Sequence, residues 1–170
     1  MNVRVICLFV AIIAVANAFT FDLEAKKHRC FTEELPTGIE VTASFAAAPG
    51  YAQYVDVKIT DPMNKVIFEE IGNDRGKFKG TIAVGGDYAV CFYSRMVQGV
   101  SYNQGMKRTI SFDLKTGSET HDYAALATKE HLKPMEVNLR VMEDVVRTIH
   151  TEYGYYKERE MTMRDTNEHM

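Results

Sequence analysis

The side chains in this sequence that could perform chemistry are its three cysteines and five histidines, because thiolates and imidazoles bind zinc and act as nucleophiles and bases. Cys30 and His28 stand two residues apart, but no further His or Cys lies near them at the spacing of a zinc site. The sequence therefore predicts no metal ion and no cofactor. The histidines are scattered along the chain, at His28, His121, His131, His150 and His169.

Two other motifs could support an enzyme, and neither is complete. His121 and Asp122 are adjacent and could orient a base, but the chain has no G-x-S-x-G serine to serve as a nucleophile. The loop 72–78 resembles a phosphate-binding loop, yet its glycines stand one residue too close, and Phe78 replaces the Ser or Thr that would hold magnesium. We therefore predict that the protein is not an enzyme.

The first 18 residues have the pattern of a secretory signal peptide. Arg4 supplies the positive charge, residues 5–15 are all apolar, and Ala16-Asn17-Ala18 forms an A-x-A cleavage site. A transmembrane anchor is the alternative, but an apolar run of this length spans only about half of a ~30 Å hydrocarbon layer. We expect residues 1–18 to be removed as the chain enters the secretory pathway.

Cleavage of the signal peptide leaves two cysteines, Cys30 and Cys91, because Cys7 is removed with it. Two cysteines in an oxidising compartment predict one disulfide bond. The loop between them is 61 residues long, for which the chain-entropy account gives a stabilisation of roughly 4 kcal/mol. The alternative is that one or both thiols are buried and unpaired.

The composition is that of an ordinary globular protein. The 170 residues are 46% hydrophobic and carry a formal net charge of −3, with an isoelectric point near 6.0. This balance provides no basic field, so we expect no nucleic-acid partner and no attachment to an anionic membrane surface. After residue 18 no stretch is apolar for long enough to cross a bilayer, so the mature chain as written is expected to be soluble.

Residues 19–118 have the pattern of an antiparallel β-sandwich. Apolar and polar residues alternate in 39–45 and again in 54–60. Asp61-Pro62-Met63-Asn64 is typical of a turn leading into a strand at 65–70, and Gly85-Gly86 suits a two-residue hairpin turn between strands at 77–84 and 87–93. A last strand is expected at 107–114, and an exposed loop at 97–105.

The hydrophobic period changes to 3.5 residues from Leu132 onward, after a linker at 119–131 in which a short helix is expected. Pro134 marks the start of the long helix, because proline is tolerated only in the first turn. Residues 132–170 are therefore predicted to form a coiled-coil stalk. Its oligomerisation seam consists of Leu132, Met135, Leu139, Met142, Val146, Ile149, Tyr153, Tyr156 and Met163.

The seam contains polar interruptions. Glu160 and Asn167 occupy core positions, and Gly154 weakens the helix by about 1 kcal/mol relative to alanine. Polar core positions cost stability but select the partner, so we expect selective pairing. The alternative is a single helix that packs on its own sandwich, although such helices rarely run past about 25 residues.

Three segments of the helix and three of the sandwich match one known family. The helical segments are 132–144, 155–160 and 163–168, and those of the sandwich are Cys30-Phe31, Gly76-Lys77-Phe78 and Val90-Cys91-Phe92. On these residues the chain resembles the GOLD-domain cargo receptors of the early secretory pathway, in particular their delta subfamily. The resemblance covers residues 19–168 and implies the GOLD sandwich fold with a Cys30–Cys91 disulfide.

This resemblance implies a cargo receptor or adaptor in vesicle-mediated transport between endoplasmic reticulum and Golgi. The sandwich would bind lumenal secretory cargo, including lipid-anchored proteins, and the stalk would pair with sister family members in a homo- or hetero-oligomer. Family members continue into one transmembrane helix and a cytosolic tail that binds the COPI and COPII coats, whereas this sequence stops at Met170. The full-length chain would be a single-pass type I membrane protein if it carries that span. As written, the chain is expected to be soluble, lumenal or secreted, and the resemblance assigns coat binding to none of its residues.

A protein of another class would share many of these features. A secreted, lectin-like β-sandwich module with a carbohydrate or lipid ligand would be a compact monomer whose helix packs on its own core. An elongated particle in sedimentation would count against such a module and favour the cargo-receptor hypothesis.

Overall fold

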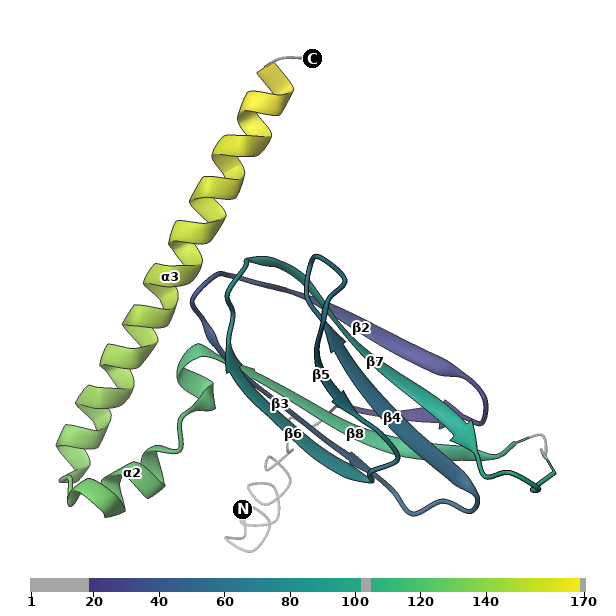
Figure 1. The fold of residues 1–170 in the computed structure, drawn as a ribbon. Coiled ribbons are helices and arrows are strands. Elements are labelled where there is room, and N and C mark those ends of the chain that lie inside the picture. Colours follow the sequence, from purple (N-terminus) through teal and green to yellow (C-terminus); the bar gives the residue numbers. More distant parts are fainter. Residues whose placement is uncertain (1–18, 102–104, 169–170) are drawn as a thin grey trace, which may run out of the picture.

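The computed structural model describes residues 19–101 and 105–168, which form a two-layer β-sandwich followed by a long helix (Figure 1). This confirms the predicted fold class. One sheet has the strand order β1-β8-β3-β6 and the other β2-β7-β4-β5, and the paired strands are antiparallel. The elements are β1 (Phe19–Glu24), β2 (His28–Leu35), β3 (Glu40–Ala47), β4 (Gln53–Thr60), β5 (Val66–Glu70), β6 (Arg75–Thr81), β7 (Gly86–Met96), β8 (Lys107–Thr116), η1 (Gly117–Thr120), α2 (Tyr123–Glu130) and α3 (Pro134–Glu168).

The hydrophobic core lies between the two sheets because side chains alternate along each strand. In β4, Val55, Val57 and Ile59 are buried, and the residues between them reach the outer face of the sheet. Phe92 of β7 is fully buried, and its ring centroid lies 5.2–6.1 Å from those of three other phenylalanines, Phe21, Phe45 and Phe112. The inner faces are thus used for packing, and the outer faces are available for binding.

The strand connections confirm one expected turn and correct another. β4 and β5 pair on either side of residues 61–64, and Asp61 Oδ1 accepts hydrogen bonds from the backbone N–H groups of Met63 and Lys65. The hairpin expected at Gly85-Gly86 is wrong, because β6 pairs with β3 in one sheet and β7 lies between β2 and β4 in the other. Gly86 keeps a positive φ of 141°, so the glycine is needed where the chain crosses between the sheets.

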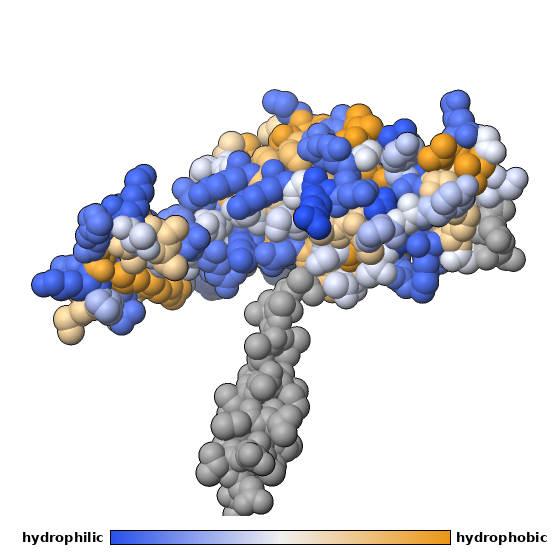
Figure 2. Space-filling model, turned by 90° about the horizontal axis from the view of Figure 1, so that it is seen from below, coloured by the Kyte–Doolittle hydropathy of each residue, from blue (hydrophilic) through white to orange (hydrophobic). Residues whose placement is uncertain are grey.

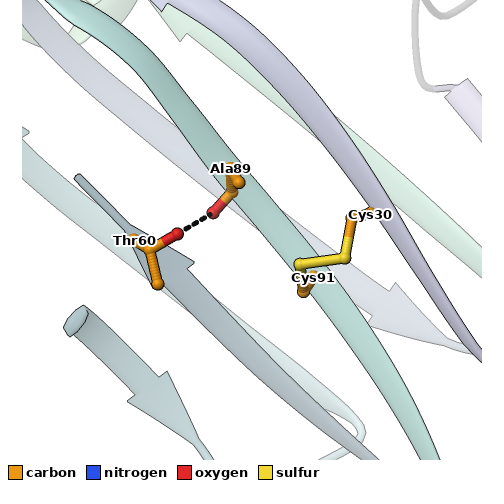
Figure 3. The surroundings of a disulfide bond; sticks show 4 residues. All are labelled: Cys30, Thr60, Ala89 and Cys91. Carbon is orange, nitrogen blue, oxygen red and sulfur yellow. Dashed lines mark hydrogen bonds between the residues drawn. A yellow bond between two sulfur atoms is a disulfide. The ribbon is translucent and has the colours of Figure 1, made fainter. Parts of the chain in front are cut away.

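The Cys30–Cys91 disulfide joins β2, at the edge of its sheet, to the central strand β7 (Figure 3). The two residues lie directly opposite each other in the antiparallel register, with their Cα atoms 4.0 Å apart. The bond therefore ties an edge strand to the core of the sheet and closes a loop with a sequence separation of 61.

Local capping explains where both α-helices begin and where α2 ends. Asp122 accepts a hydrogen bond from Ala125 N–H at the start of α2, and His131 ends that helix in the left-handed conformation. At the start of α3, Glu136 reaches back to accept a hydrogen bond of 2.7 Å from Lys133 N–H, next to Pro134. The predicted start of the long helix at Pro134 is thus confirmed.

Helix α3 has 35 residues, about 50 Å at 1.5 Å per residue, and its C-terminal part projects beyond the sandwich (Figure 1). Viewed from below, hydrophilic side chains cover most of the sandwich, and hydrophobic side chains form smaller patches, including one on the helical part at the left (Figure 2). None of the helices within the described residues is both long enough and apolar enough to cross a membrane.

Candidate functional site: the two faces of the long helix

The predicted seam faces away from the sandwich along the length of α3. Its large apolar side chains are exposed to between 52% and 76% of their full area. Leu132 lies just before the helix and is half-buried. The exposed members are Met135, Leu139, Met142, Val146, Ile149, Tyr153, Tyr156 and Met163.

A second row of residues, which we call the docking stripe, lies on the opposite face of the helix. Each member stands two positions after a seam residue, and two positions correspond to a rotation of about 200° around an α-helix. All of its members are buried or half-buried, and most are polar. The docking stripe consists of Val137, Val141, Asp144, Thr148, Thr151 and Tyr155.

One close contact between α3 and the end of the sandwich is at Gly117 and Thr148. Ser118 N–H donates a hydrogen bond of 3.1 Å to Thr148 Oγ1, and that hydroxyl donates to the carbonyl oxygen of Asp144 at 2.9 Å. A Cβ atom on Gly117 would lie 2.4 Å from Thr148 Cγ2, and Gly117 has a φ of +54°. Glycine is therefore required here both for its backbone conformation and for the close packing of the helix.

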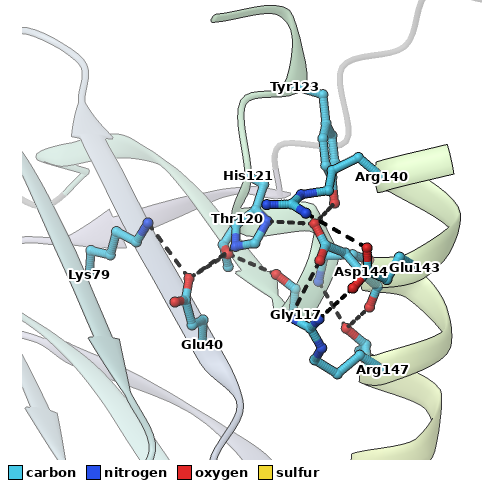
Figure 4. Close-up of polar contacts among 12 residues, drawn as sticks. Glu40, Lys79, Gly117, Thr120, His121, Tyr123, Arg140, Glu143, Asp144 and Arg147 are labelled. Atoms are coloured by element: carbon cyan, nitrogen blue, oxygen red, sulfur yellow. Dashed lines mark hydrogen bonds and ion pairs between the residues drawn. The ribbon is translucent and has the colours of Figure 1, made fainter. Parts of the chain in front are cut away.

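A polar cluster around Asp144 joins α3 to the linker and to β3 (Figure 4). His121 Nδ1 lies 3.1 Å from Asp144 Oδ2, and the Tyr123 hydroxyl donates a hydrogen bond of 3.1 Å to the same oxygen. On its other side, His121 Nε2 lies 3.3 Å from Glu40 Oε2, which also faces Lys79 Nζ at 3.7 Å. His121 thus connects a carboxylate of the helix with a carboxylate of the sheet.

The environment of Asp144 favours its ionised form. Burial alone would raise the pKa of this carboxyl, but the hydrogen bonds from His121 and Tyr123 and the charge of Arg147 hold the pKa below its usual value of 3.8. Burial, together with the hydrogen bond to the carboxylate, raises the pKa of Tyr123. A charged Asp144 with three partners therefore fixes the linker against the helix.

The second polar contact lies further along α3, at Glu34 of β2. The Tyr155 hydroxyl donates a hydrogen bond of 2.9 Å to Glu34 Oε1, and Arg159 forms an ion pair with Oε2. The hydrogen bond from Tyr155, helped by Arg159, lowers the pKa of Glu34 despite its partial desolvation. A Cβ on Gly85 would lie only 2.7 Å from the Tyr155 ring, so this glycine, expected in a hairpin turn, instead makes room for the helix.

These contacts bear on both interpretations of the helix. α3 does lie against its own sandwich, as the alternative proposed, but it does so through the polar docking stripe, and the apolar seam is left exposed. Pairing of the seam with another helix stays a prediction. Sequence reasoning missed the docking stripe because its polar residues resemble an ordinary solvated face; the only sign of it was their 3-4 spacing, two positions out of phase with the seam.

The remaining residues considered for chemistry are not brought together. His28 stacks on Tyr93, His131 caps α2 and His150 lies exposed on α3, while His169 lies outside the described residues. Within residues 19–101 and 105–168, no group of three or more His, Cys, Asp or Glu side chains is arranged to hold a metal ion.

Comparison with known proteins places this architecture in a family. The family model described as emp24/gp25L/p24 family/GOLD matches residues 18–170. A disulfide-linked β-sandwich followed by a long helix, matched over this range, defines a GOLD-domain protein. The chain belongs to the emp24/gp25L/p24 family, as its motifs predicted.

Individual relatives agree with this assignment. Transmembrane emp24 domain-containing protein 9 of Bos taurus is 28% identical over 179 residues, covering 98% of this chain and 75% of that protein. Transmembrane emp24 domain-containing protein 10 of Homo sapiens is 31% identical over 157 residues, covering 89% of this chain and 68% of that protein. Among solved structures, the periplasmic lysozyme inhibitor PliG of Aeromonas hydrophila covers 58% of this chain and 84% of that chain at 10% identity, and its TM-score of 0.39 is too low to carry an argument.

Proposed function

We propose that this protein is a non-enzymatic cargo receptor or adaptor subunit that acts between the endoplasmic reticulum and the Golgi. The sandwich binds lumenal secretory cargo, including lipid-anchored proteins, and the helix assembles the chain with sister members of its family. Membership in the emp24/gp25L/p24 family supports this role. Contact with a vesicle coat would require a cytosolic tail, and a type I membrane orientation would require the span that the named relatives carry.

The observation that carries this proposal is the division of α3 into two faces. The docking stripe holds the sandwich, and the seam exposes eight large apolar side chains on the opposite side. One helix can therefore hold its own sandwich and pair with another helix at the same time. In such an assembly the sandwiches would lie on the outside of the helical bundle, where several copies contact cargo together and weak contacts gain avidity.

The strength of pairing follows from the exposed area of the seam. Burial of a large, half-exposed apolar side chain contributes on the order of 1 kcal/mol, and association costs roughly 4–15 kcal/mol in lost freedom. A pair of chains buries two seams, or sixteen such side chains, so the gain is close to the upper end of that cost. We expect pairing that is reversible and sensitive to the partner, which suits a receptor that assembles and disassembles during transport.

The proposed division of the chain follows the same logic. Residues 1–18 act as the signal peptide, residues 19–118 as the GOLD sandwich, residues 119–131 as the linker with its short helix, and residues 132–170 as the coiled-coil stalk. The docking contacts at Gly117, Asp144 and Glu34 join the sandwich to the stalk and set the angle between them.

The assembly is tested by sedimentation and cross-linking of a variant with both Leu139→Asp and Ile149→Asp. We expect the wild-type chain to form oligomers and the variant to be monomeric with a folded sandwich. A further variant, Met163→Asp, changes one seam residue and should also weaken pairing. Met161→Asp is its matched control, because both methionines are about half exposed but only Met163 belongs to the seam. Unchanged oligomers in the seam variants would show that the seam is not the pairing surface.

The transport role is tested in cells depleted of the protein. We expect lipid-anchored secretory proteins to leave the endoplasmic reticulum more slowly, and the wild-type chain and the Met161→Asp variant to restore their export. The variant with Leu139→Asp and Ile149→Asp should fail to restore it. Normal export after depletion would contradict the cargo-receptor role.

A further inference from the structure

A hollow of about 310 Å³ lies on the outer face of the sheet β2-β7-β4-β5, away from α3. We propose that this hollow binds a neutral sugar unit of a glycan. The side chains that carry the argument are His28, Asp56, Lys58, Glu69, Tyr93 and Arg95. The proposal stands on the geometry of this face and does not depend on the transport role; if both hold, glycosylated proteins are a class of cargo.

The strand register brings these side chains to one place. His28 of β2 lies opposite Tyr93 of β7, and Tyr93 lies opposite Asp56 of β4. On the same face, Lys58 of β4 lies opposite Glu69 of β5. Four strands thus contribute to the hollow, and a site built on strands of a sheet is more rigid than one built on loops.

Aromatic rings form one wall of the hollow. The rings of His28 and Tyr93 are stacked, with centroids 5.6 Å apart and planes 24° from parallel. Tyr93 is 38% exposed although it lies in the middle of a sheet. Exposed rings with a polar tip suit a ligand that has both C–H faces and hydroxyl groups.

Six charged side chains line the hollow: two pairs account for four of them, Lys27 pairs with Glu24 at 2.6 Å, and Lys26 is the sixth. Arg95 holds Asp56 in a bidentate ion pair, with Nη2 donating to Oδ1 at 2.7 Å, and Gly72 N–H donates to the same carboxylate oxygen at 2.8 Å. Lys58 pairs with Glu69 at 3.0 Å. The hydrogen bond from Arg95 outweighs burial and lowers the pKa of Asp56, so the pair stays ionised at neutral pH.

This pairing argues for a neutral, polyhydroxylated ligand. The paired groups keep donor and acceptor capacity at their outer edges. Four basic and two acidic residues line the hollow, and with Glu24 beside Lys27 their charges sum to only +1. The volume lies at the lower end of the range for small-ligand sites, which suits one or two sugar units rather than a folded protein surface. The planar Arg95–Asp56 pair and the Lys58–Glu69 pair, beside the ring of Tyr93, therefore favour a sugar over an ionic ligand.

The hollow is separated from the docking contacts of α3. His28 and Glu34 stand at opposite ends of β2, about 20 Å apart at ~3.3 Å per residue. A bound glycan would therefore leave both the docking stripe and the seam of the helix unobstructed. The sandwich could bind a ligand while the helix holds its partners.

The test is a nuclear magnetic resonance titration of the ¹⁵N-labelled chain, with its disulfide formed, against mannotriose, chitotriose and lactose. We expect at least one of these neutral saccharides to shift the amide signals of Asp56, Tyr93 and Arg95 saturably at concentrations up to about 10 mM. Tyr93→Ala should weaken binding about tenfold, and Tyr93→Phe, which keeps the ring, should retain most of it. Tyr51→Ala is the matched control, since Tyr51 is 80% exposed and does not line the hollow.

Three results would overturn the proposal. The first is that none of the three saccharides shifts these signals while the spectrum shows a folded chain. The second is equal affinity in the wild-type chain and the Tyr93→Ala variant. The third is preferential binding of an acidic heparin tetrasaccharide at the same signals, which would assign the hollow to anionic ligands.

Discussion

Asp144 of α3 and His121 of the linker face each other at 3.1 Å, and through His121 the helix is connected to Glu40 of β3. This relationship places a buried helix carboxylate and a strand carboxylate on either side of one imidazole. It lies next to the close contact of Gly117 with Thr148. The orientation of the stalk therefore depends on a small number of polar contacts, and each can be tested separately.

Replacement of Gly117 by alanine should loosen the helix from the sandwich. The added Cβ would meet Thr148 Cγ2 at 2.4 Å, and a φ of +54° is unfavourable for alanine. The backbone cost is about 1 kcal/mol, and we expect the clash to add roughly another 1–2 kcal/mol. Chemical denaturation measures the loss of stability, and hydrogen exchange measures the opening of α3.

The matched control is Gly99→Ala. Gly99 also has a positive φ, of 85°, but nothing lies within 4 Å of its added Cβ. We expect this variant to lose only the backbone contribution and to leave exchange in α3 unchanged. Equal effects of the two substitutions would show that the contact with Thr148 does not hold the helix.

The junction should weaken in acid because Asp144 loses its charge. Its pKa in the folded chain is lower than the usual 3.8, so its contribution to stability is fully present above that value. The contribution is lost as the pH falls through the lower, folded-state pKa. Thermal unfolding can be followed from about pH 7 to about pH 2, a range that covers the titration of such carboxyls. We expect the unfolding temperature of the wild type to be higher than that of Asp144→Asn near neutrality, and this difference to shrink in acid. A difference in unfolding temperature that stays constant over this range would show that the charge of Asp144 does not stabilise the junction.

The contact at Glu34 should restrain the part of α3 that follows the Asp144 cluster. Tyr155→Phe removes the hydrogen bond of 2.9 Å to Glu34 but keeps the ring against Gly85. We therefore expect faster hydrogen exchange in α3 from about this residue onward, and no change in the sandwich core. The lowered pKa of Glu34 should also move toward its usual value, which nuclear magnetic resonance titration of the carboxyl would detect.

Tyr156→Phe is the control for that experiment, because Tyr156 is the exposed neighbour that belongs to the seam. Its hydroxyl does not contact Glu34, so we expect exchange in the monomer to match the wild type. If both variants behave alike, the contact between Tyr155 and Glu34 does not restrain the helix.

Much of this architecture could be predicted because its causes are local. Alternation in 54–60 predicts which side chains of β4 enter the core, and Pro134 with Glu136 marks the start of α3. The disulfide could be predicted because cleavage of a signal peptide would leave two cysteines, which allow a single pairing. The 3.5-residue period likewise selects the seam, since the spacing of apolar residues along one helix depends only on its own sequence.

Other features depend on contacts between distant segments. Gly85-Gly86 has the composition of a hairpin turn, but β7 pairs with β2 and β4 rather than with β6, so the chain crosses between the sheets. No local pattern could reveal this choice, because strand pairing is decided by the burial that each arrangement achieves.

The sequence by itself determined the sandwich class, the disulfide, the long helix and its apolar seam, because each depends on residue types at fixed spacing. Only the tertiary structure decided that the polar face of the helix holds the sandwich and that four strands gather His28, Tyr93, Asp56 and Glu69 around one hollow. The physical reason is that polar residues look alike in a sequence whether they face water or a partner, and only the fold shows which partner lies within reach.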